Sequence, residues 1–401
     1  MRKKPVSLGC YCGALLFFYY FTFGIFGSML TIYLSDLGKS AVETSFVLSA
    51  SGIFAIALQP VVGFLDDRVK SRKALGGVIL GLAAIASICF AFTRQTFLLF
   101  LLDGLVLSGM SSLLPVFEKI ATSGPYRYGA VRIWGSIGFA AASQLASILY
   151  AHVLRQSVFF AAALALLLTI FFLTRFSAAS MAQAPVEKKP QPGDWHPARA
   201  LLRSRTYLVF LLLSIVFAAL SVANETYLPL FLTESGLSVP QSGLVLSLAV
   251  LMELPLLLLS HRYMDGLSGK KLLALVFASL GVQFLCYWLF PSPPLISVCA
   301  VLLRAVGSNM LFVMVTMKIV LHVIEEQYTS TALGIAAMVK SVGSIIFQGF
   351  SGLLVDAKGF SGLYGFATIL TAVGLLFCVM LRQERQAERA IFSGRQSSSG
   401  Q

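Results

Sequence analysis

Charged side chains are scarce in this chain, because Asp, Glu, Lys and Arg together make up only 12% of its 401 residues. Motifs for chemistry on soluble substrates are missing as well: the chain has no G-x-x-x-x-G-K-[ST] loop, no H-E-x-x-H and no G-x-S-x-G nucleophile elbow. The sequence therefore predicts neither an enzyme nor an ATP-driven pump, and it predicts no cofactor.

Signals for metal and nucleic-acid binding are equally sparse. The six cysteines include no Cys-x-x-Cys pair, and Cys10 with Cys12 forms only a lone Cys-x-Cys, so no metal site is predicted. Lys and Arg number 30 against 17 Asp and Glu, but no interspersed basic surface accompanies this excess. We therefore expect no nucleic-acid partner, and we attribute the positive charge to membrane topology.

Long apolar runs dominate instead, with 57% of residues hydrophobic against roughly 45 to 50% in soluble domains. A transmembrane helix needs about 20 mostly apolar residues, and a helix satisfies its backbone hydrogen bonds internally within the bilayer. Twelve such runs occur, at residues 8–34, 44–65, 74–92, 96–118, 127–151, 157–176, 206–232, 241–260, 271–290, 295–323, 329–356 and 361–381. The expected fold class is an all-α polytopic membrane protein with twelve transmembrane helices in the lipid bilayer. The first run follows a basic head but has no A-x-A-like cleavage site, so a retained span is expected.

The two halves of the chain repeat each other. Shifted by 198 residues, YLSDLGKSAVETSFVLS (33–49) aligns with FLTESGLSVPQSGLVLS (231–247) without a gap and with six identities. The same register pairs the charged hairpins GFLDDRVKSRK (63–73) and HRYMDGLSGKK (261–271), which indicates two parallel six-helix repeats. The predicted domains are an N-terminal six-helix bundle at 1–176, a cytoplasmic linker at 177–205, a C-terminal six-helix bundle at 206–382 and a cytoplasmic tail at 383–401.

The distribution of Lys and Arg over the loops predicts the orientation, because positive residues are retained on the cytoplasmic side. With the N-terminus inside, 22 basic residues lie at the inner side and four at the outer side. The outer ones are Lys39, Arg94, Arg155 and Lys358. Both termini are therefore expected in the cytoplasm, with the protein in the plasma membrane.

The hairpin after the second span carries a recognisable pattern, G-x-x-x-D-R-x-x-x-R-K. Its residues are Gly63, Asp67, Arg68, Arg72 and Lys73. Together with twelve helices in two parallel repeats, the pattern resembles the major facilitator superfamily. The resemblance implies secondary transport, and it implies that the Asp and Arg of this loop latch the cytoplasmic helix ends. The alternative is that these charges only fix the topology.

Three further stretches, LLFFYYFTFG, GIFAIALQPVVGFLDDRVKSRK and FEKIATSGPYRYGAVRIWGSIGF, resemble the oligosaccharide:proton symporter group, which includes lactose permease. On this resemblance Arg132 takes the place of a sugar-binding arginine, and Phe139 takes that of a nearby tryptophan. The acidic partner of the arginine falls on Leu114, and the coupling His and Glu fall on Ala305 and Ser308, so galactoside recognition is not implied. The VLMELP pattern also resembles the phenylpropionate-permease-like branch.

Ionisable residues within the predicted spans are costly near the bilayer midplane, so each is a functional candidate. Glu253 and Lys340 lie nearest the midplane, and Glu253 is the expected proton site. Asp103 is either a second titrating site or a polar helix-packing group. Glu225 and Arg304 lie at similar depth, which predicts a salt bridge between them, as a static staple or as a gate.

The residues expected at the substrate combine a cation, aromatic faces and an amide: Arg132, Trp134, Phe139, Tyr20, Phe23 and Asn309. A guanidinium beside aromatic rings suits a sugar, a nucleoside or an aromatic carboxylate, although such rings also pack helices. We therefore predict a monomeric secondary active transporter that moves a small polar solute with a proton by alternating access. An uncoupled facilitator, an effluxer of the same fold, or a non-transporting receptor or sensor are the alternatives.

Overall fold

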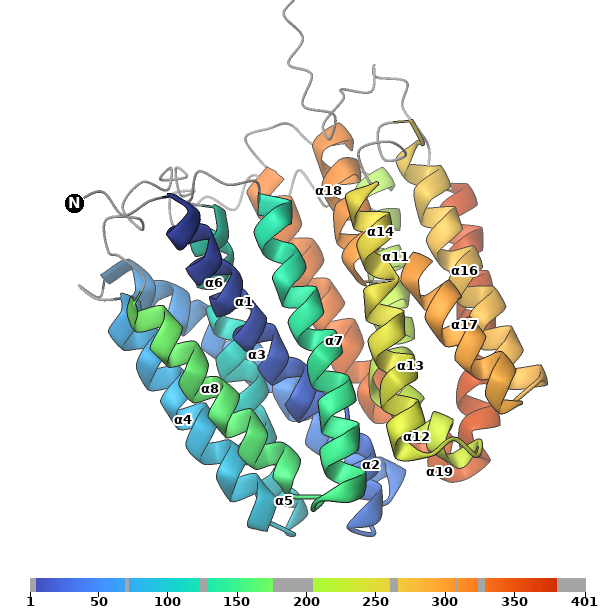
Figure 1. Cartoon of the computed structure of the whole chain (residues 1–401). Helices are drawn as coiled ribbons and strands as arrows, with labels where there is room; N and C mark the ends of the chain where they lie inside the picture. The colour runs from blue at the N-terminus through green and yellow to red at the C-terminus, as the bar shows by residue number, and fades with distance from the viewer. Residues whose placement is uncertain are drawn as a thin grey trace, which may run out of the picture. The chain divides into compact units, whose positions relative to one another are not determined.

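The computed structural model describes residues 5–68, 72–122, 128–175, 205–259, 266–307, 309–323 and 329–380, and every regular element within these ranges is helical (Figure 1). The helices of the first part of the chain are α1 (Pro5–Gly27), α2 (Leu30–Asp36), α3 (Ala41–Arg68), α4 (Arg72–Phe92), α5 (Thr96–Asp103), the π-helical η1 (Gly104–Ser108), α6 (Gly109–Thr122), α7 (Tyr128–His152) and α8 (Ser157–Arg175). Those of the second part are α11 (Arg205–Val222), the π-helical η2 (Ala223–Tyr227), α12 (Leu228–Glu234), α13 (Val239–Leu251), α14 (Glu253–Leu258), α16 (Gly269–Leu289), α17 (Pro293–Val306), α18 (Asn309–Val323) and α19 (Thr329–Met380).

The number of membrane spans agrees with the sequence once the longest helix is divided. Eleven helical stretches of the described chain are long and apolar enough to cross a membrane. The last of them covers 49 residues within α19, too many for one crossing. At Gly359 the backbone of α19 leaves the helical region, with φ 64° and ψ −167°, so the helix turns there and supplies two spans. The predicted twelve spans are therefore confirmed.

The described helices group into two compact units. The first comprises Met1–Lys188, Glu225–Leu251 and Ile345–Phe360, and the second comprises Lys189–Asn224, Met252–Ser344 and Ser361–Gln401. In the first unit α1 packs along α7 and α4 packs along α8 (Figure 1). The predicted domain boundaries stay predictions, because the tail at 383–401 and all of the linker at 177–205 except Arg205 lie outside the described residues.

Prolines interrupt two spans that the sequence predicts as continuous. Pro255 cannot donate to the carbonyl of Leu251, and the chain breaks at Met252 between α13 and α14. Pro229 likewise cannot donate to the carbonyl of Glu225, and the turn before it widens into η2. The tenth span breaks at Gly307, between α17 and α18. These interruptions supply irregular backbone within the membrane, which membrane proteins tolerate where protein or water surrounds it.

The outward face of α4 shows why this bundle needs lipid. Val78, Leu82 and Ile85 recur at helical spacing and are 62%, 57% and 61% exposed. A continuous apolar stripe of this kind is unfavourable in water but matches the hydrocarbon of a bilayer. The opposite side of the same helix contributes buried Leu80, which lies in the protein core.

The turns before α3 and α13 repeat each other bond for bond. Gly38 and Gly236, 198 residues apart, both adopt left-handed backbone conformations, with φ 77° and φ 105°. The amide of Gly38 donates to Ser35 O over 2.9 Å, and that of Gly236 donates to Thr233 O over 3.0 Å. In each turn the next amide donates to the carbonyl five residues earlier, over 3.1 Å, which completes the same glycine C-cap. The internal repeat is therefore confirmed in the backbone.

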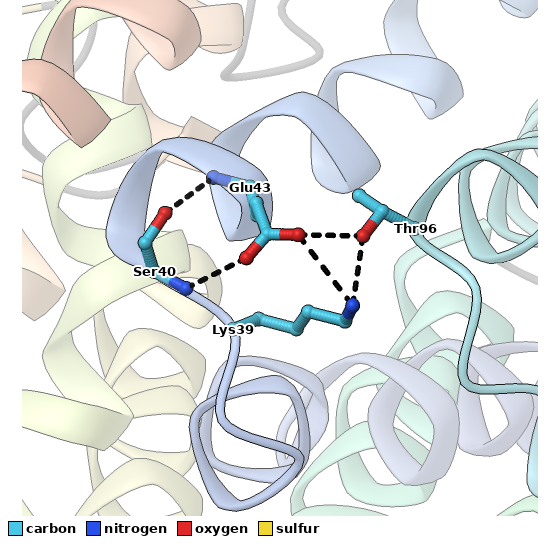
Figure 2. A network of polar contacts seen from close by, with 4 residues as sticks. All are labelled: Lys39, Ser40, Glu43 and Thr96. Atoms are coloured by element: carbon cyan, nitrogen blue, oxygen red, sulfur yellow. Dashed lines mark hydrogen bonds and ion pairs between the residues drawn. The ribbon is translucent and has the colours of Figure 1, made fainter.

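Each of these turns leads into the same kind of capped helix. At α3 the amide of Glu43 donates to Ser40 Oγ over 3.1 Å, and the amide of Ser40 donates to Glu43 Oε2 over 3.2 Å (Figure 2). At α13 Ser238 and Gln241 exchange the equivalent two bonds, over 3.4 and 2.8 Å. Both pairs are capping boxes, which satisfy amides that a helix start otherwise leaves unpaired.

Two charged side chains extend the cap of α3. Lys39 Nζ donates to Thr96 Oγ1 over 2.8 Å, and Thr96 Oγ1 donates to Glu43 Oε1 over 2.7 Å (Figure 2). Asp356 of α19 binds the same helix start, accepting from the amides of Ala41 over 2.9 Å and Val42 over 3.0 Å. A carboxylate is favoured there because the helix macrodipole and the unpaired amides attract negative charge.

A lysine near the start of α4 and another near the start of α16 each bind the end of a second helix. Lys73, the second residue of α4, donates to Thr174 O at the end of α8 over 3.0 Å. Lys270, the second residue of α16, donates to Val379 O at the end of α19 over 2.8 Å. Each lysine therefore binds a carbonyl at the negative end of a helix in its own unit.

Candidate functional site

The best-defined arrangement of candidate residues lies where α1 crosses α7. The guanidinium carbon of Arg132 lies 4.1 Å from the centroid of the Tyr20 ring, and both side chains are half-buried. A guanidinium at this distance from a ring gains from the negative potential of the aromatic face. The five N–H donors of arginine lie in the guanidinium plane, so an arginine over a ring still presents donors at its edge.

Glycines allow the two helices to approach this closely. A methyl group at Gly138 of α7 would overlap the carbonyl of Phe17 on α1. A methyl group at Gly24 of α1 would lie 2.7 Å from Phe139 O and 2.8 Å from Ala142 Cβ. Backbone therefore lies directly against backbone, and the positions of side chains along the crossing follow from this contact.

Further aromatic rings lie beside Tyr20, the ring that the arginine contacts. Phe23 has its ring centroid 6.2 Å from that of Tyr20, and Tyr19 has its centroid 5.3 Å from it. Tyr19 is fully buried, donates to Met110 O over 2.6 Å and stacks on Phe117, so it holds α1 against α6. Trp134 lies against Gly13 and is 49% exposed.

Of the six residues predicted at the substrate, the structure brings together Arg132, Tyr20 and Phe23, and the binding role of all six stays a prediction. Tyr20 and Phe23 come from α1, whereas Arg132, Trp134 and Phe139 come from α7. The sixth, Asn309, is the first residue of α18, but its side chain lies outside those described. Sequence reasoning missed Gly135 and Gly138, although their i, i+3 spacing after Arg132 places all three on one side of α7.

Asp103 is the most isolated ionisable group among the described residues. It ends α5 and is fully buried, and neither of its carboxyl oxygens has a hydrogen-bond partner in the described part of the chain. The π-helical η1 follows it, where the Ser108 hydroxyl bonds the carbonyl of Gly104 and Phe54 of α3 lies directly against Gly104. Wide helical turns of this kind occur frequently at functional sites.

The second unit places a cation over aromatic faces. The rings of Phe217 and Phe312 stack with centroids 3.8 Å apart, and Lys340 Nζ lies 5.4 Å from the first ring centroid and 5.8 Å from the second. Glu253 is half-buried and begins α14, directly after the break at Met252. The structure does not assign coupling roles, so those of Lys340 and Glu253 stay predictions.

Two other predicted features stay predictions as well. Glu225 lies in the first unit and Arg304 in the second, and their pairing is untested. The latch role of the loop pattern also stays a prediction, because α3 ends at Arg68, α4 begins at Arg72, and the residues between them lie outside the described chain. Of its side chains only Lys73 is described, whereas those of Gly63, Asp67, Arg68 and Arg72 lie outside the described side chains.

Comparison with known proteins agrees with this architecture. The sequence model of the Major Facilitator Superfamily matches residues 12–347. The chain belongs to the Major Facilitator Superfamily. It is 26% identical over 378 residues to a maltose permease of Geobacillus stearothermophilus, covering 92% of this chain and 94% of the permease. It is 24% identical over 386 residues to the sugar efflux transporter C of Escherichia coli, covering 90% and 94% of the two chains.

Solved structures of the superfamily share the fold. The crystal structure of the nucleoside transporter NupG superposes with a TM-score of 0.78 at 18% identity, covering 93% of this chain and 98% of that one. The protein is therefore a multi-pass membrane protein of a transporter family and not an enzyme. The predicted relationship to the oligosaccharide:proton symporter group is confirmed by the maltose, raffinose and lactose permeases among its relatives.

Proposed function

We propose that this transporter moves a sugar across the plasma membrane, with Arg132 as its principal substrate ligand. The observation that supports the proposal is the position of the Arg132 guanidinium over the Tyr20 ring, at 4.1 Å. Adjacent hydroxyl groups of a sugar offer paired acceptors that match the fork of guanidinium donors. The apolar face of a sugar ring packs on aromatic side chains, and Phe23 lies beside Tyr20 with ring centroids 6.2 Å apart. Trp134 and Phe139, on the same helix as Arg132, are the further aromatic candidates.

The names of the relatives favour a sugar over other polar solutes. The relative named maltose permease aligns with 92% of this chain, and the relative named raffinose permease aligns with 34% of it. A nucleoside is the second substrate class, because the nucleoside permease NupG of Escherichia coli is 22% identical over 262 residues. A nucleoside also carries a hydroxylated ring and a flat aromatic base, so the same arginine and aromatic faces suit it.

Arg132→Lys tests the substrate role of the arginine. Lysine keeps the positive charge but loses the planar fork, so the affinity of the purified protein for radiolabelled maltose, raffinose or uridine should fall at least tenfold. Arg155→Lys is the matched control, because the exposed Arg155 lies in the turn after α7, with its Nε 3.4 Å from Asp36 Oδ2. Equal affinity of Arg132→Lys and the wild type would remove Arg132 from the substrate site.

We infer further that a proton drives uptake and that Asp103 or Glu253 carries it. Burying an unpaired carboxylate costs several kcal/mol, which gives the isolated Asp103 a physical reason to hold a proton in this conformation. Glu253 is the second candidate, because it is half-buried and begins α14 directly after the break at Met252.

Asp103→Asn and Glu253→Gln distinguish the two carboxyls. The variant that removes the coupling proton should still exchange substrate down a gradient but lose accumulation driven by an imposed pH gradient in vesicles. Glu43→Gln, at the start of α3, is the control carboxyl, because it takes part in a helix cap. If both variants still concentrate substrate against its gradient, the driving ion is not a proton on either residue.

Export is the second candidate function. Its support is the likeness to the sugar efflux transporter C, which covers 90% of this chain. Accumulation of labelled sugar in energised inside-out vesicles, and none in right-side-out vesicles, would indicate export. Equal, gradient-independent exchange in both would indicate an uncoupled facilitator, whereas binding without any exchange would indicate a receptor or sensor.

A further inference from the structure

We propose that Tyr20 and Gly135 are positioning residues, which together form a seat that holds the Arg132 guanidinium in its substrate-binding orientation. The inference rests on the proposed role of Arg132 as a substrate ligand and assigns that site a specificity device of its own. The seat consists of one ring from α1 and one residue without a side chain on α7, next to the arginine on the helix surface.

The Tyr20 ring is the surface against which the guanidinium of Arg132 lies. At 4.1 Å from the ring centroid, the guanidinium of Arg132 lies within cation–π range of Tyr20. The five N–H donors of the guanidinium lie in one plane, and they are the groups from which a pair of substrate hydroxyls would accept. A long arginine side chain otherwise samples many rotamers, so a ring that holds it reduces the ordering cost of binding.

Gly135 supplies the space that the seat needs. A methyl group at Gly135 would lie 2.6 Å from Tyr20 Cδ2 and 2.9 Å from Arg132 Nη1. Both distances are shorter than ordinary contacts between carbon and its neighbours, so alanine at this position would push the ring and the fork apart. The residues displaced are the two members of the cation–π pair.

Gly138, one turn further along α7, separates this role from helix packing. A methyl group at Gly138 would meet the backbone of Phe17, which can move only with the whole of α1. Alanine at Gly135 meets side-chain atoms, which can move while the helices stay in place. Gly135→Ala is therefore expected to lower affinity with little loss of stability, whereas Gly138→Ala is expected to lower stability.

The test compares affinity in two backgrounds. In the otherwise wild-type protein, Tyr20→Leu and Gly135→Ala should each weaken maltose binding about tenfold, and Tyr20→Phe, which keeps the ring, should stay within about twofold. In the Arg132→Lys background the same changes should have little further effect, because the seat acts only through the guanidinium. Gly27→Ala is the control on α1, since no described atom outside the local backbone lies within 4 Å of the added methyl.

A second readout needs no substrate. Phenylglyoxal reacts with accessible guanidinium groups, and mass spectrometry of the peptide that contains Arg132 measures the rate. Tyr20→Leu and Gly135→Ala should raise this rate severalfold over the wild type, whereas Tyr20→Phe and Gly27→Ala should leave it unchanged.

The outcomes separate this inference from the function on which it rests. Unchanged maltose affinity in Arg132→Lys removes the substrate role of the arginine, while the phenylglyoxal rates still show whether the seat exists. A large loss in Arg132→Lys, combined with unchanged affinity and unchanged phenylglyoxal rates in Tyr20→Leu and Gly135→Ala, overturns the seat alone. Equal losses from Tyr20→Leu in both backgrounds show a general packing role instead.

Discussion

The N-termini of α3 and α13 occupy matched places in the two halves, 198 residues apart, and they differ in what binds them. Both follow a left-handed glycine and both carry a capping box. Within the described residues, only α3 is also bound by a carboxylate from a distant helix, because Asp356 accepts from the amides of Ala41 and Val42. The position that matches Val42 is Pro240, which has no amide hydrogen to donate.

The helix crossings beside these termini both pack a glycine against a serine, but the two residues lie on exchanged helices. Beside the start of α13, the chain packs through small residues, with Gly243 against Ser147 of α7 and the Ser247 hydroxyl donating to Ala140 O over 2.6 Å. Beside the start of α3, a glycine again meets a serine, but on exchanged helices: Gly352 of α19 lies against Ser45. The repeat therefore preserves backbone geometry and close packing, while in the part of the chain that the structure describes a distant carboxylate binds the start of α3 and not that of α13.

The close packing at Gly243 should produce the largest effect of a single change. Gly243→Ser places a side chain against Ser147 and within reach of Ser143 O, which is 3.0 Å from the added carbon, so overpacking should cost about 1–3 kcal/mol. The second change Ser147→Gly restores the glycine–serine pair in the exchanged order that Ser45 and Gly352 already use. Thermal unfolding in detergent should therefore show a lowered melting temperature for the single variant and recovery for the double variant. Losses that simply add would show that the two crossings are not equivalent.

The carboxylate of Asp356 should have an intermediate effect. Asp356→Asn removes the charge and one of the two acceptors, so the start of α3 should lose about 1 kcal/mol, with a smaller loss at high salt. Hydrogen exchange should become faster at the first amides of α3 and stay unchanged at those of α13. Pro240→Val is the matched control, because it returns an amide hydrogen to α13 without giving it a carboxylate. Equal acceleration at both helix starts would mean that Asp356 acts on the whole unit and not on the cap of α3.

Most of the framework that carries these contacts was predictable from residue pattern. Apolar runs gave the spans, and the alignment of Gly38 with Gly236 gave the repeat, because both signals are local in sequence. The sequence also selected Arg132 and Tyr20 without showing that they touch, since that contact depends on how Gly138 lets α7 approach α1. The cap that Asp356 provides for α3 spans 315 residues of chain, and no local pattern reports it.

The prolines inside the spans were also visible in the sequence, but the sequence did not show how each one would change its helix. Pro229 and Pro255 sit within apolar runs that are long enough to span without interruption, so the predicted helices were continuous. The backbone instead widens before one proline and breaks before the other, because each removes a donor to the carbonyl four residues earlier. Isolation of the Asp103 carboxyl follows from burial on all sides, which a single helix pattern does not determine.

The exchange Glu43→Gln should have the smallest effect, and it makes the box of α3 identical in type to that of α13. The amide oxygen can still accept from Ser40, as Gln241 accepts from Ser238 over 2.8 Å, so the capping box itself should survive. What disappears is the carboxylate that Thr96 and Lys39 share, at 2.7 Å from Thr96 Oγ1 and 3.5 Å from Lys39 Nζ. Because this pair is half-exposed, the loss should be a few tenths of a kcal/mol and should vanish at high salt. The reverse change Gln241→Glu should give no gain, since Leu237 stands where α3 has Lys39. Melting temperatures of both variants at low and high salt decide the point: a salt-independent loss in Glu43→Gln would locate the cost in the backbone cap and not in the charge.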